Sequence, residues 1–506
     1  MEPAQNQNKR GPFTQGSLDQ FLFKKFKQNQ NEPENGRKEE PVQINLPPTT
    51  HPIQNQFSSQ NQFSQKKYYL FPTKRNNWPR IQQRLKTIAE GKSSLEDTIL
   101  VIEYTLKEQT PLKIYDLATL KKFLLSFDLN ARKHCTEKVF SCIAKLVLRT
   151  EELFPNPLPM LVQGTAEKVT LSKEQCACLL ANMFMGTTIP QKNDKLAEYY
   201  NFYFWFKKDF KNEKTTIEKI KFIYHYFERI SQGIPDAYIK FERAVLKDSV
   251  QGSCLLSDWK KSQAPLKNAQ IFEVGRIEDS SNTIEIDFAN QYLGGMALTS
   301  ALAQEEIIFT VSPECIVGTL ISEIMREDEA ILIQGAERYC EYSGYRSDFL
   351  FKGPHVHAVQ LNEEKVLNRE ILAIDALSFR STQIPEYSSQ GILRELNKAY
   401  VGFSASDDLG NKEKKDIATG RWGCGVFKGD VQLKFIIQWA AASRAGRDMQ
   451  FYSFEDSKMK GADKIINKFK GMYVRDLVVE TINICELFNR NPKPKKDLFS
   501  ILLEKR

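Results

Sequence analysis

The hydrophobic pattern of this chain changes near Pro265, and the change restricts the folds that the sequence can adopt. Before it, apolar residues recur at spacings of three and four, as over residues 217–230, which is typical of amphipathic helices. After it, short β-branched apolar runs alternate with helical patterns. This alternation predicts a layered α/β sheet with helices on its faces and a ligand crevice at the carboxyl ends of the strands. We therefore expect a helical unit over residues 69–265 and an α/β unit over residues 266–490.

Individual elements can be predicted within both units. In the helical unit, Ser172 and Gln175 have the spacing of a capping box and predict the start of a helix. In the α/β unit, the predicted strands are residues 283–288, 330–335, 355–361, 371–377 and 449–454, and the predicted helices are residues 389–400 and 431–443.

The two ends of the chain differ from the rest in composition. Residues 1–68 are rich in Gln, Asn and Pro and poor in aliphatic residues, so we expect a disordered tail. Within it, Gln15, Leu18 and Phe21 resemble a peptide that binds DNA sliding clamps, although Leu22 stands where a second aromatic residue is expected. An ordinary charged tail remains the alternative. Residues 491–506 form a basic, Pro-interrupted extension.

Charge, cysteines and hydropathy place limits on partners and location. The net charge of +8 suits work near polyanions and equally suits a plain, slightly basic surface. Nine scattered cysteines, an odd count, favour free thiols over a disulfide framework. His355 and His357 have no third ligand nearby, so a strand pair is preferred to a metal site. Because we find neither a signal peptide nor a membrane-spanning run, we expect a nuclear or cytoplasmic protein without membrane contact.

A candidate site lies between Thr283 and Phe309. A predicted strand is followed by a glycine pair and then by a helical pattern that ends in two adjacent glutamates, which an apolar run follows. Glycine lets the backbone approach a ligand closely, and burial raises the pKa of a carboxyl group and suits it to proton donation. By default, two adjacent acids at a helix end form a solvated turn. Adjacent residues on a helix diverge by roughly 100°, so Glu305 and Glu306 need not share a role, and Asp287 and Asn290 are placed to orient the site.

A second candidate is the glycine-rich segment from Arg421 to Asp430, which precedes a predicted helix. Asp430 suits the N-cap of that helix. Backbone N–H groups at such a turn favour phosphate binding, whereas a plain tight loop has the same pattern. The residues alone leave both interpretations open.

Several of these motifs, in this order, resemble the poly(ADP-ribose) glycohydrolase family. The matching segments are Ile286–Asn290, Gly294–Gly295, Gln304–Glu306, Glu341–Tyr345, Trp422–Phe427, Ile437–Trp439, Arg447–Asp448 and Tyr452–Phe454, together with Ser172–Phe184 and Ile220–Ile230 in the helical unit. The likeness covers about residues 69–490. It implies a macrodomain, a mixed sheet with flanking helices, preceded by an all-helical accessory domain.

The resemblance also implies roles for individual residues. Glu306 would be the general acid/base that cleaves the ribose–ribose O-glycosidic bond, Glu305 would bind ribose hydroxyls, and Asp287 would support both. The expected substrate-binding residues are Ile277 and Glu278 near the adenine, Tyr345 stacked on it, Asn290 and Gln304 at the terminal ADP-ribose, Gly423, Cys424, Gly425 and Val426 at the diphosphate, and Phe427 and Phe454 at the ribose. Gly294 and Gly295, which allow close approach of the substrate, and Trp422 belong to the same set. Neither a metal nor a cofactor is implied, and we expect a monomer that acts on poly(ADP-ribose) and on proteins modified with it.

Two positions depart from the family pattern. Met296 stands where a third glycine is usual, which would matter if that position needed a positive φ. Arg421 stands where Asn is usual. Two other functions fit the same residues: a macrodomain that reads ADP-ribose without cleaving it, and a hydrolase that removes single ADP-ribose units from proteins.

Overall fold

The computed structural model describes residues 66–109, 115–190, 200–246, 254–356, 360–406, 414–490 and 496–504. The predicted clamp-binding residues Gln15, Leu18 and Phe21 lie outside these ranges, so that motif stays a prediction.

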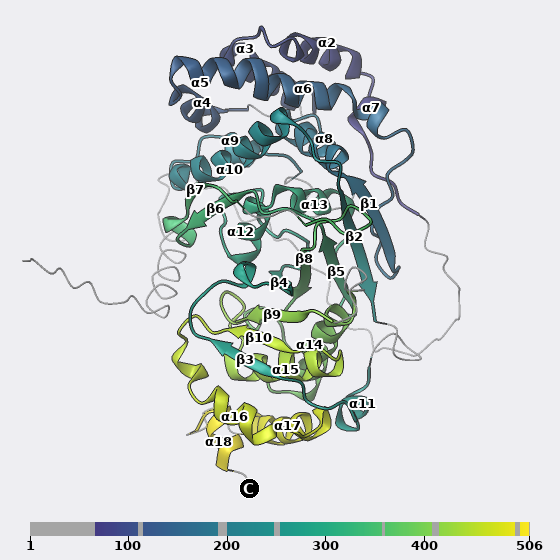
Figure 1. Cartoon of the computed structure of the whole chain (residues 1–506), viewed down its shortest axis with the longest axis vertical. Coiled ribbons are helices and arrows are strands. Elements are labelled where there is room, and N and C mark those ends of the chain that lie inside the picture. Colours follow the sequence, from purple (N-terminus) through teal and green to yellow (C-terminus); the bar gives the residue numbers. More distant parts are fainter. Residues whose placement is uncertain are drawn as a thin grey trace, which may run out of the picture. The chain divides into compact units, whose positions relative to one another are not determined.

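Eight strands of the described chain form one mixed sheet in the order β1–β2–β5–β8–β4–β9–β10–β3 (Figure 1). Strands β4 and β8 are parallel neighbours, as are β4 and β9, β9 and β10, and β10 and β3. The carboxyl ends of these five strands therefore lie at one edge of the sheet, where ligands bind in folds of this type. The sheet strands are β1 (Glu167–Ser172), β2 (Tyr238–Val245), β3 (Ala269–Phe272), β4 (Thr283–Ala289), β5 (Glu329–Gln334), β8 (Glu370–Asp375), β9 (Asp416–Gly420) and β10 (Met449–Tyr452).

Helices cover this sheet on both faces. Helix α14 (Ser389–Phe403) packs on β5, β8 and α15 (Val431–Arg444), and α12 (Gln304–Val311) packs on β4. Every residue of β5 and β8 is buried, which explains the apolar runs 330–333 and 371–374 at their centres. The remaining helices of the described residues are α2 (Trp78–Ala89), α3 (Leu95–Gln109), α4 (Ala118–Leu125), α5 (Leu129–His134), α6 (Ser141–Leu148), α7 (Thr150–Leu153), α8 (Lys173–Phe184), α9 (Tyr203–Phe206), α10 (Glu213–Gln232), α11 (Leu256–Lys260), α13 (Val317–Ile321), α16 (Ala462–Phe469), α17 (Val474–Arg490) and α18 (Leu498–Glu504).

Two predicted helix starts are confirmed by their caps. The Ser172 hydroxyl accepts a hydrogen bond from the Gln175 N–H at 3.1 Å, and the Gln175 side chain accepts one from the Ser172 N–H at 2.9 Å. The Asp430 carboxylate accepts a hydrogen bond from the Leu433 N–H at 2.9 Å. These side chains satisfy N–H groups that the first turn of a helix leaves unpaired.

The helical unit is less uniform than its sequence indicated. Strands β1 and β2 belong to the residues predicted to be helical, yet both join the mixed sheet, so the expectation of helices alone is wrong at these two places. One buried apolar cluster also runs from Tyr69 in the helical unit to Ala373 in β8. The helical unit and the sheet therefore share a hydrophobic core.

The strands predicted over residues 283–288, 330–335, 371–377 and 449–454 are confirmed as β4, β5, β8 and β10, with shifts of up to two residues at their ends. The strand predicted over residues 355–361 is not found at His355, Val356 or Gln360, and residues 357–359 lie outside the described residues. The strand lies earlier, as β7 (Leu350–Pro354), and pairs with β6 (Cys340–Ser343). The strand pairing ends at Cys340 and Pro354, and one further main-chain hydrogen bond runs from the His355 N–H to the Tyr339 carbonyl at 3.0 Å.

Two further expectations can be compared with the structure. All nine cysteines are free thiols, as predicted. In the part of the chain that the structure describes, we find no helix with the length and apolar character needed to cross a membrane.

Candidate active site

The predicted site residues follow the carboxyl ends of four neighbouring parallel strands. Ile277 and Glu278 follow β3, the glycine pair follows β4, the glycine-rich segment follows β9, and Phe454 follows β10. Parallel pairing brings these ends to one edge of the sheet, although the segments are far apart in the sequence. The sheet therefore gathers motifs that the sequence shows only as separate patterns.

The two glutamates lie in the first turn of α12, which corrects the expectation that they end a helix. Helix α12 begins at Gln304, and residues 297–300, predicted to be helical, form turns. The Glu306 carboxylate explains this start, because its Oε2 accepts a hydrogen bond from the Ala303 N–H at 2.7 Å. An acid in the first turn is also stabilised by the helix dipole.

Both carboxylates bind main-chain N–H groups of the loop after β4. Glu305 accepts hydrogen bonds from the N–H groups of Gly294 at 2.7 Å and Asn290 at 2.9 Å. Oε1 of Glu306 accepts one from Met296 at 3.2 Å. The two glutamates are only 4% and 7% exposed. These hydrogen bonds therefore join the loop after β4, here called the glycine loop because it carries Gly294 and Gly295, to the first turn of α12.

The close approach of this loop requires Gly295. A Cβ atom placed there would lie 2.5 Å from Oε2 of Glu305 and 3.2 Å from Oε1 of Glu306, and the residue has a φ of +49°. Met296 does not have a positive φ, so this departure from the family pattern causes no left-handed strain. Its side chain is exposed, and its N–H is one of the groups that hold Glu306.

Asp287 lies on β4, the strand against which α12 packs, and is completely buried. Neither of its carboxyl oxygens has a hydrogen-bond partner among the described residues. Burial, reinforced by the charge of Glu306, raises the pKa of Asp287 well above its usual range. Burial and the charges of Asp287 and Glu306 also raise the pKa of Glu305, against the opposing effect of its two N–H donors. The cluster therefore retains a proton at pH values where exposed acids are ionised.

Gln304, which was expected to contact substrate, binds the main chain of β4 through both atoms of its amide. Its Oε1 accepts a hydrogen bond from the Phe288 N–H at 2.8 Å, and its Nε2 donates one to the Ile286 carbonyl at 2.9 Å. The side chain thus attaches the start of α12 to the strand that carries Asp287.

The glycine-rich segment forms a closed turn between β9 and α15. The Gly429 N–H donates to the Gly423 carbonyl at 2.9 Å. The Trp422 side chain is fully buried beneath the turn and donates from Nε1 to the Ile374 carbonyl at 2.9 Å, so it supports the loop from within the core. Val426 is exposed at the tip. Arg421 pairs with Asp456 at 3.0 Å and so connects this turn to the loop after β10.

The residues predicted to hold the nucleotide differ in exposure. Tyr345 and Phe454 are 39% and 45% exposed, so their rings are open to a ligand. Ile277 is buried, and the Glu278 carboxylate accepts a hydrogen bond from the Tyr342 hydroxyl. Cys424 is partly buried, and burial raises the pKa of its thiol. The side chains of Tyr345 and Phe454 are therefore accessible from solvent, whereas those of Ile277, Glu278 and Cys424 are wholly or partly buried.

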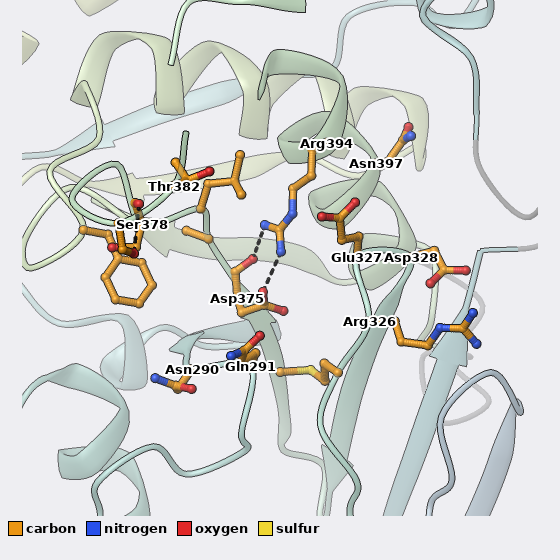
Figure 2. A pocket seen from close by; sticks show the side chains of 15 residues that line it. Asn290, Gln291, Arg326, Glu327, Asp328, Asp375, Ser378, Thr382, Arg394 and Asn397 are labelled. Atoms are coloured by element: carbon orange, nitrogen blue, oxygen red, sulfur yellow. Dashed lines mark hydrogen bonds and ion pairs between the residues drawn. The ribbon is translucent and has the colours of Figure 1, made fainter. Parts of the chain in front are cut away.

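Asn290 and Phe427 also line a cavity of about 880 Å³ at the carboxyl end of β8. Figure 2 shows Asp375 and Arg394 at its centre, joined by an ion pair of 2.5 Å. Burial acts to raise the pKa of Asp375, but Lys398 and Arg394 together hold it below its usual value. The sequence reasoning missed these residues, although an acid at the end of the predicted strand 371–377 was a signal for Asp375.

The sequence reasoning also missed Lys219 of α10. It is fully buried and contacts the segment between the glycine pair and α12. Its position was the available signal: Ile223, Phe227 and Ile230 lie four, eight and eleven residues further on, which places Lys219 on the apolar face of the helix.

Comparisons with known proteins agree with this arrangement. Residues 256–461 match the family described as "Poly (ADP-ribose) glycohydrolase (PARG), Macro domain fold", and residues 127–243 match the helical domain of the same family. These matches confirm the expected fold class.

Curated relatives from an animal and a plant show the same relationship. Poly(ADP-ribose) glycohydrolase 2 of Caenorhabditis elegans is 30% identical over 77% of this chain and 79% of its own length. Probable poly(ADP-ribose) glycohydrolase 2 of Arabidopsis thaliana is 29% identical over 77% of this chain and 87% of its length. Poly(ADP-ribose) glycohydrolase 1 of C. elegans is 33% identical over 70% of this chain, which spans only 45% of that longer protein. The chain belongs to the poly(ADP-ribose) glycohydrolase family.

Proposed function

We propose that this protein hydrolyses the ribose–ribose O-glycosidic bonds of poly(ADP-ribose), mainly at chain ends, and releases ADP-ribose. The observation that carries the proposal is the pair of buried glutamates whose carboxylates are held by the glycine loop at the ligand edge of the sheet. Family membership supplies the substrate class. A protein that only reads ADP-ribose has no need of such a buried acid pair.

In the proposed reaction, Glu306 acts first as an acid and then as a base. It donates its proton to the oxygen of the departing ribose as the glycosidic C–O bond breaks and an oxocarbenium-like centre forms. Water then adds to that carbon and returns a proton to Glu306. Glu305 binds ribose hydroxyls. The raised pKa values of Asp287 and Glu305 mean that the carboxyl cluster to which Glu306 belongs retains protons, which suits a reaction that begins with proton donation.

We further propose that three aromatic side chains hold the nucleotide part of the substrate. Tyr345 stacks on the adenine, Phe427 and Phe454 pack against ribose, and the turn from Gly423 to Val426 binds the diphosphate through its N–H groups. The exposure of Tyr345, Phe454 and Val426 supports these roles. The buried side chain of Trp422 and the strand-bound amide of Gln304 act by supporting the site.

The test is Glu306→Gln in the purified full chain, assayed for release of ADP-ribose from poly(ADP-ribose). General acid–base catalysis contributes about 10²–10⁴-fold, so kcat should fall by that factor while polymer binding persists. Glu486→Gln changes an exposed acid on α17 and should leave kcat unchanged. Near-normal turnover by Glu306→Gln would overturn the role of Glu306. Binding of polymer without turnover by the wild-type protein would favour a reader, and release from mono-modified protein alone would favour the mono-ADP-ribosyl hydrolase.

Three wider expectations also stay proposals. These are a nuclear or cytoplasmic location, a monomeric state, and clamp binding through Gln15, Leu18 and Phe21.

A further inference from the structure

The buried ammonium group of Lys219 binds three main-chain carbonyls of one short segment. Its Nζ lies at hydrogen-bond distance from the carbonyl oxygens of Ala297 (2.7 Å), Thr299 (2.8 Å) and Ala301 (2.7 Å). Lys219 belongs to α10 in the helical unit, about 80 residues before these partners. The helical unit therefore contributes a charged side chain to the loop that precedes α12.

Three carbonyl partners match the chemistry of a protonated lysine. An ammonium group has three N–H donors, whereas a neutral amine has two, so only the charged form satisfies all three oxygens. Burial lowers the pKa of Lys219 to about 7, and the nearby charge of Glu306 acts in the opposite direction. The contacts compensate for the cost of burying a charge, which explains how a lysine is accommodated on the apolar face of α10.

A second side chain of the helical unit binds the same segment. The Trp205 indole donates from Nε1 to the Ala297 carbonyl at 3.0 Å. The Nζ atom of Lys219 lies 5.1 Å from the centre of the Trp205 ring, within the range of a cation–π contact. Ala297 thus accepts hydrogen bonds from both side chains.

The segment that Lys219 holds also controls the Glu306 carboxylate. One end of the segment is Met296, whose N–H binds Oε1 of Glu306, and the other end is Ala303, whose N–H binds Oε2. The three carbonyls bound by Lys219 lie between these two donors. A shift of the segment would therefore move both groups that orient this carboxylate.

We propose that Lys219, assisted by Trp205, is a positioning residue through which the helical unit orients Glu306 for catalysis. The inference rests on the proposed role of Glu306. It gives the helical unit a part in the reaction beyond packing: the ammonium group holds residues 297–301, and their flanking N–H groups hold the carboxylate.

The experiment is Lys219→Met in the full chain, which keeps much of the apolar stem and removes the donors. Sites are counted by titration with ADP-ribose, so that kcat refers only to folded, binding-competent molecules. A misplacement of about 1 Å costs roughly 100-fold, so kcat per site should fall by about that factor, while KM changes by less than about threefold. Lys214→Met, at an exposed position on the same helix, is the matched control and should change neither value.

A second variant and a second measurement keep the test decisive if Lys219→Met folds poorly. Trp205→Phe removes only the indole N–H and should lower kcat by about fivefold, the effect of losing one hydrogen bond of about 1 kcal/mol. Amide hydrogen exchange of residues 296–303 should be faster in Lys219→Met than in wild type or Lys214→Met. Unchanged kcat per site and unchanged exchange in Lys219→Met, or an unchanged kcat in Trp205→Phe, would overturn the proposal. An inactive wild-type protein would refute the proposed function instead, and the exchange measurement would still test the contact.

Discussion

Replacing Gly295 by alanine should separate catalysis from folding, because the added methyl group would collide with the proposed catalytic acids. Its Cβ would lie 2.5 Å from Oε2 of Glu305 and 3.2 Å from Oε1 of Glu306. A carbon and an oxygen that are not bonded normally approach to about 3.3 Å. One carboxylate oxygen or the loop must therefore move by roughly 0.8 Å.

Two magnitudes follow from this geometry. The φ of +49° at this position costs an L-residue about 1–2 kcal/mol, which should appear as lost unfolding free energy. A displacement approaching 1 Å at a catalytic group costs about 100-fold in rate. Gly295→Ala should therefore remain folded at room temperature and show a kcat lowered by about two orders of magnitude.

The assay is release of ADP-ribose from poly(ADP-ribose), with stability measured by urea unfolding. Gly471→Ala is the matched control, because Gly471 also has a positive φ, +80°, but a Cβ there meets no atom within 4 Å. It should lose a similar amount of stability and keep its kcat. The reasoning is refuted if Gly295→Ala retains kcat within about threefold of wild type, or if Gly471→Ala loses as much activity.

Two further predictions concern stability. The folded state of the wild type retains the proton of Asp287 while the unfolded state loses it above about pH 4, so stability falls as the pH rises toward the raised pKa. Asp287→Asn should reduce that slope by up to about 1.4 kcal/mol per pH unit in urea unfolding between about pH 5 and pH 7, and an unchanged slope would contradict the raised pKa. Lys173→Met should cost about 3–5 kcal/mol of unfolding free energy, because it leaves the buried carboxylate of Glu314 (3.1 Å) without its cation and removes one of the two cations that Glu337 contacts (2.8 Å), the other being Arg229. Lys74→Met, at an exposed ion pair, should change it by less than about 1 kcal/mol, and equal effects of the two variants would count against this account.

Sequence reasoning succeeded where burial leaves a local pattern. Strands β4, β5 and β8 are buried along almost their whole length, so their apolar runs were visible without any knowledge of their neighbours. The caps at Ser172 and Asp430 were predicted because a capping residue and its partner lie within three residues of each other.

Sequence reasoning failed where a strand forms only by pairing with a strand that is distant in the sequence. Strands β3 and β9 are only four and five residues long and give little periodic signal. Strands β1 and β2 stand among helical patterns and become part of the sheet only by pairing with each other and with β5. The pattern over residues 355–361 suits a strand, but pairing with β6 ends at Pro354.

At the site, the sequence alone determined the parts: the glycine pair, the two glutamates, Asp287 and the glycine-rich turn. The tertiary structure decided how they act. It placed the glutamates in the first turn of α12, directed the amide of Gln304 to β4, and brought Lys219 from the helical unit to the loop that holds Glu306. The physical reason is distance along the chain. Propensity and periodicity report on neighbours within a few residues, whereas the orientation of a buried carboxylate depends on donors and charges that only packing brings near.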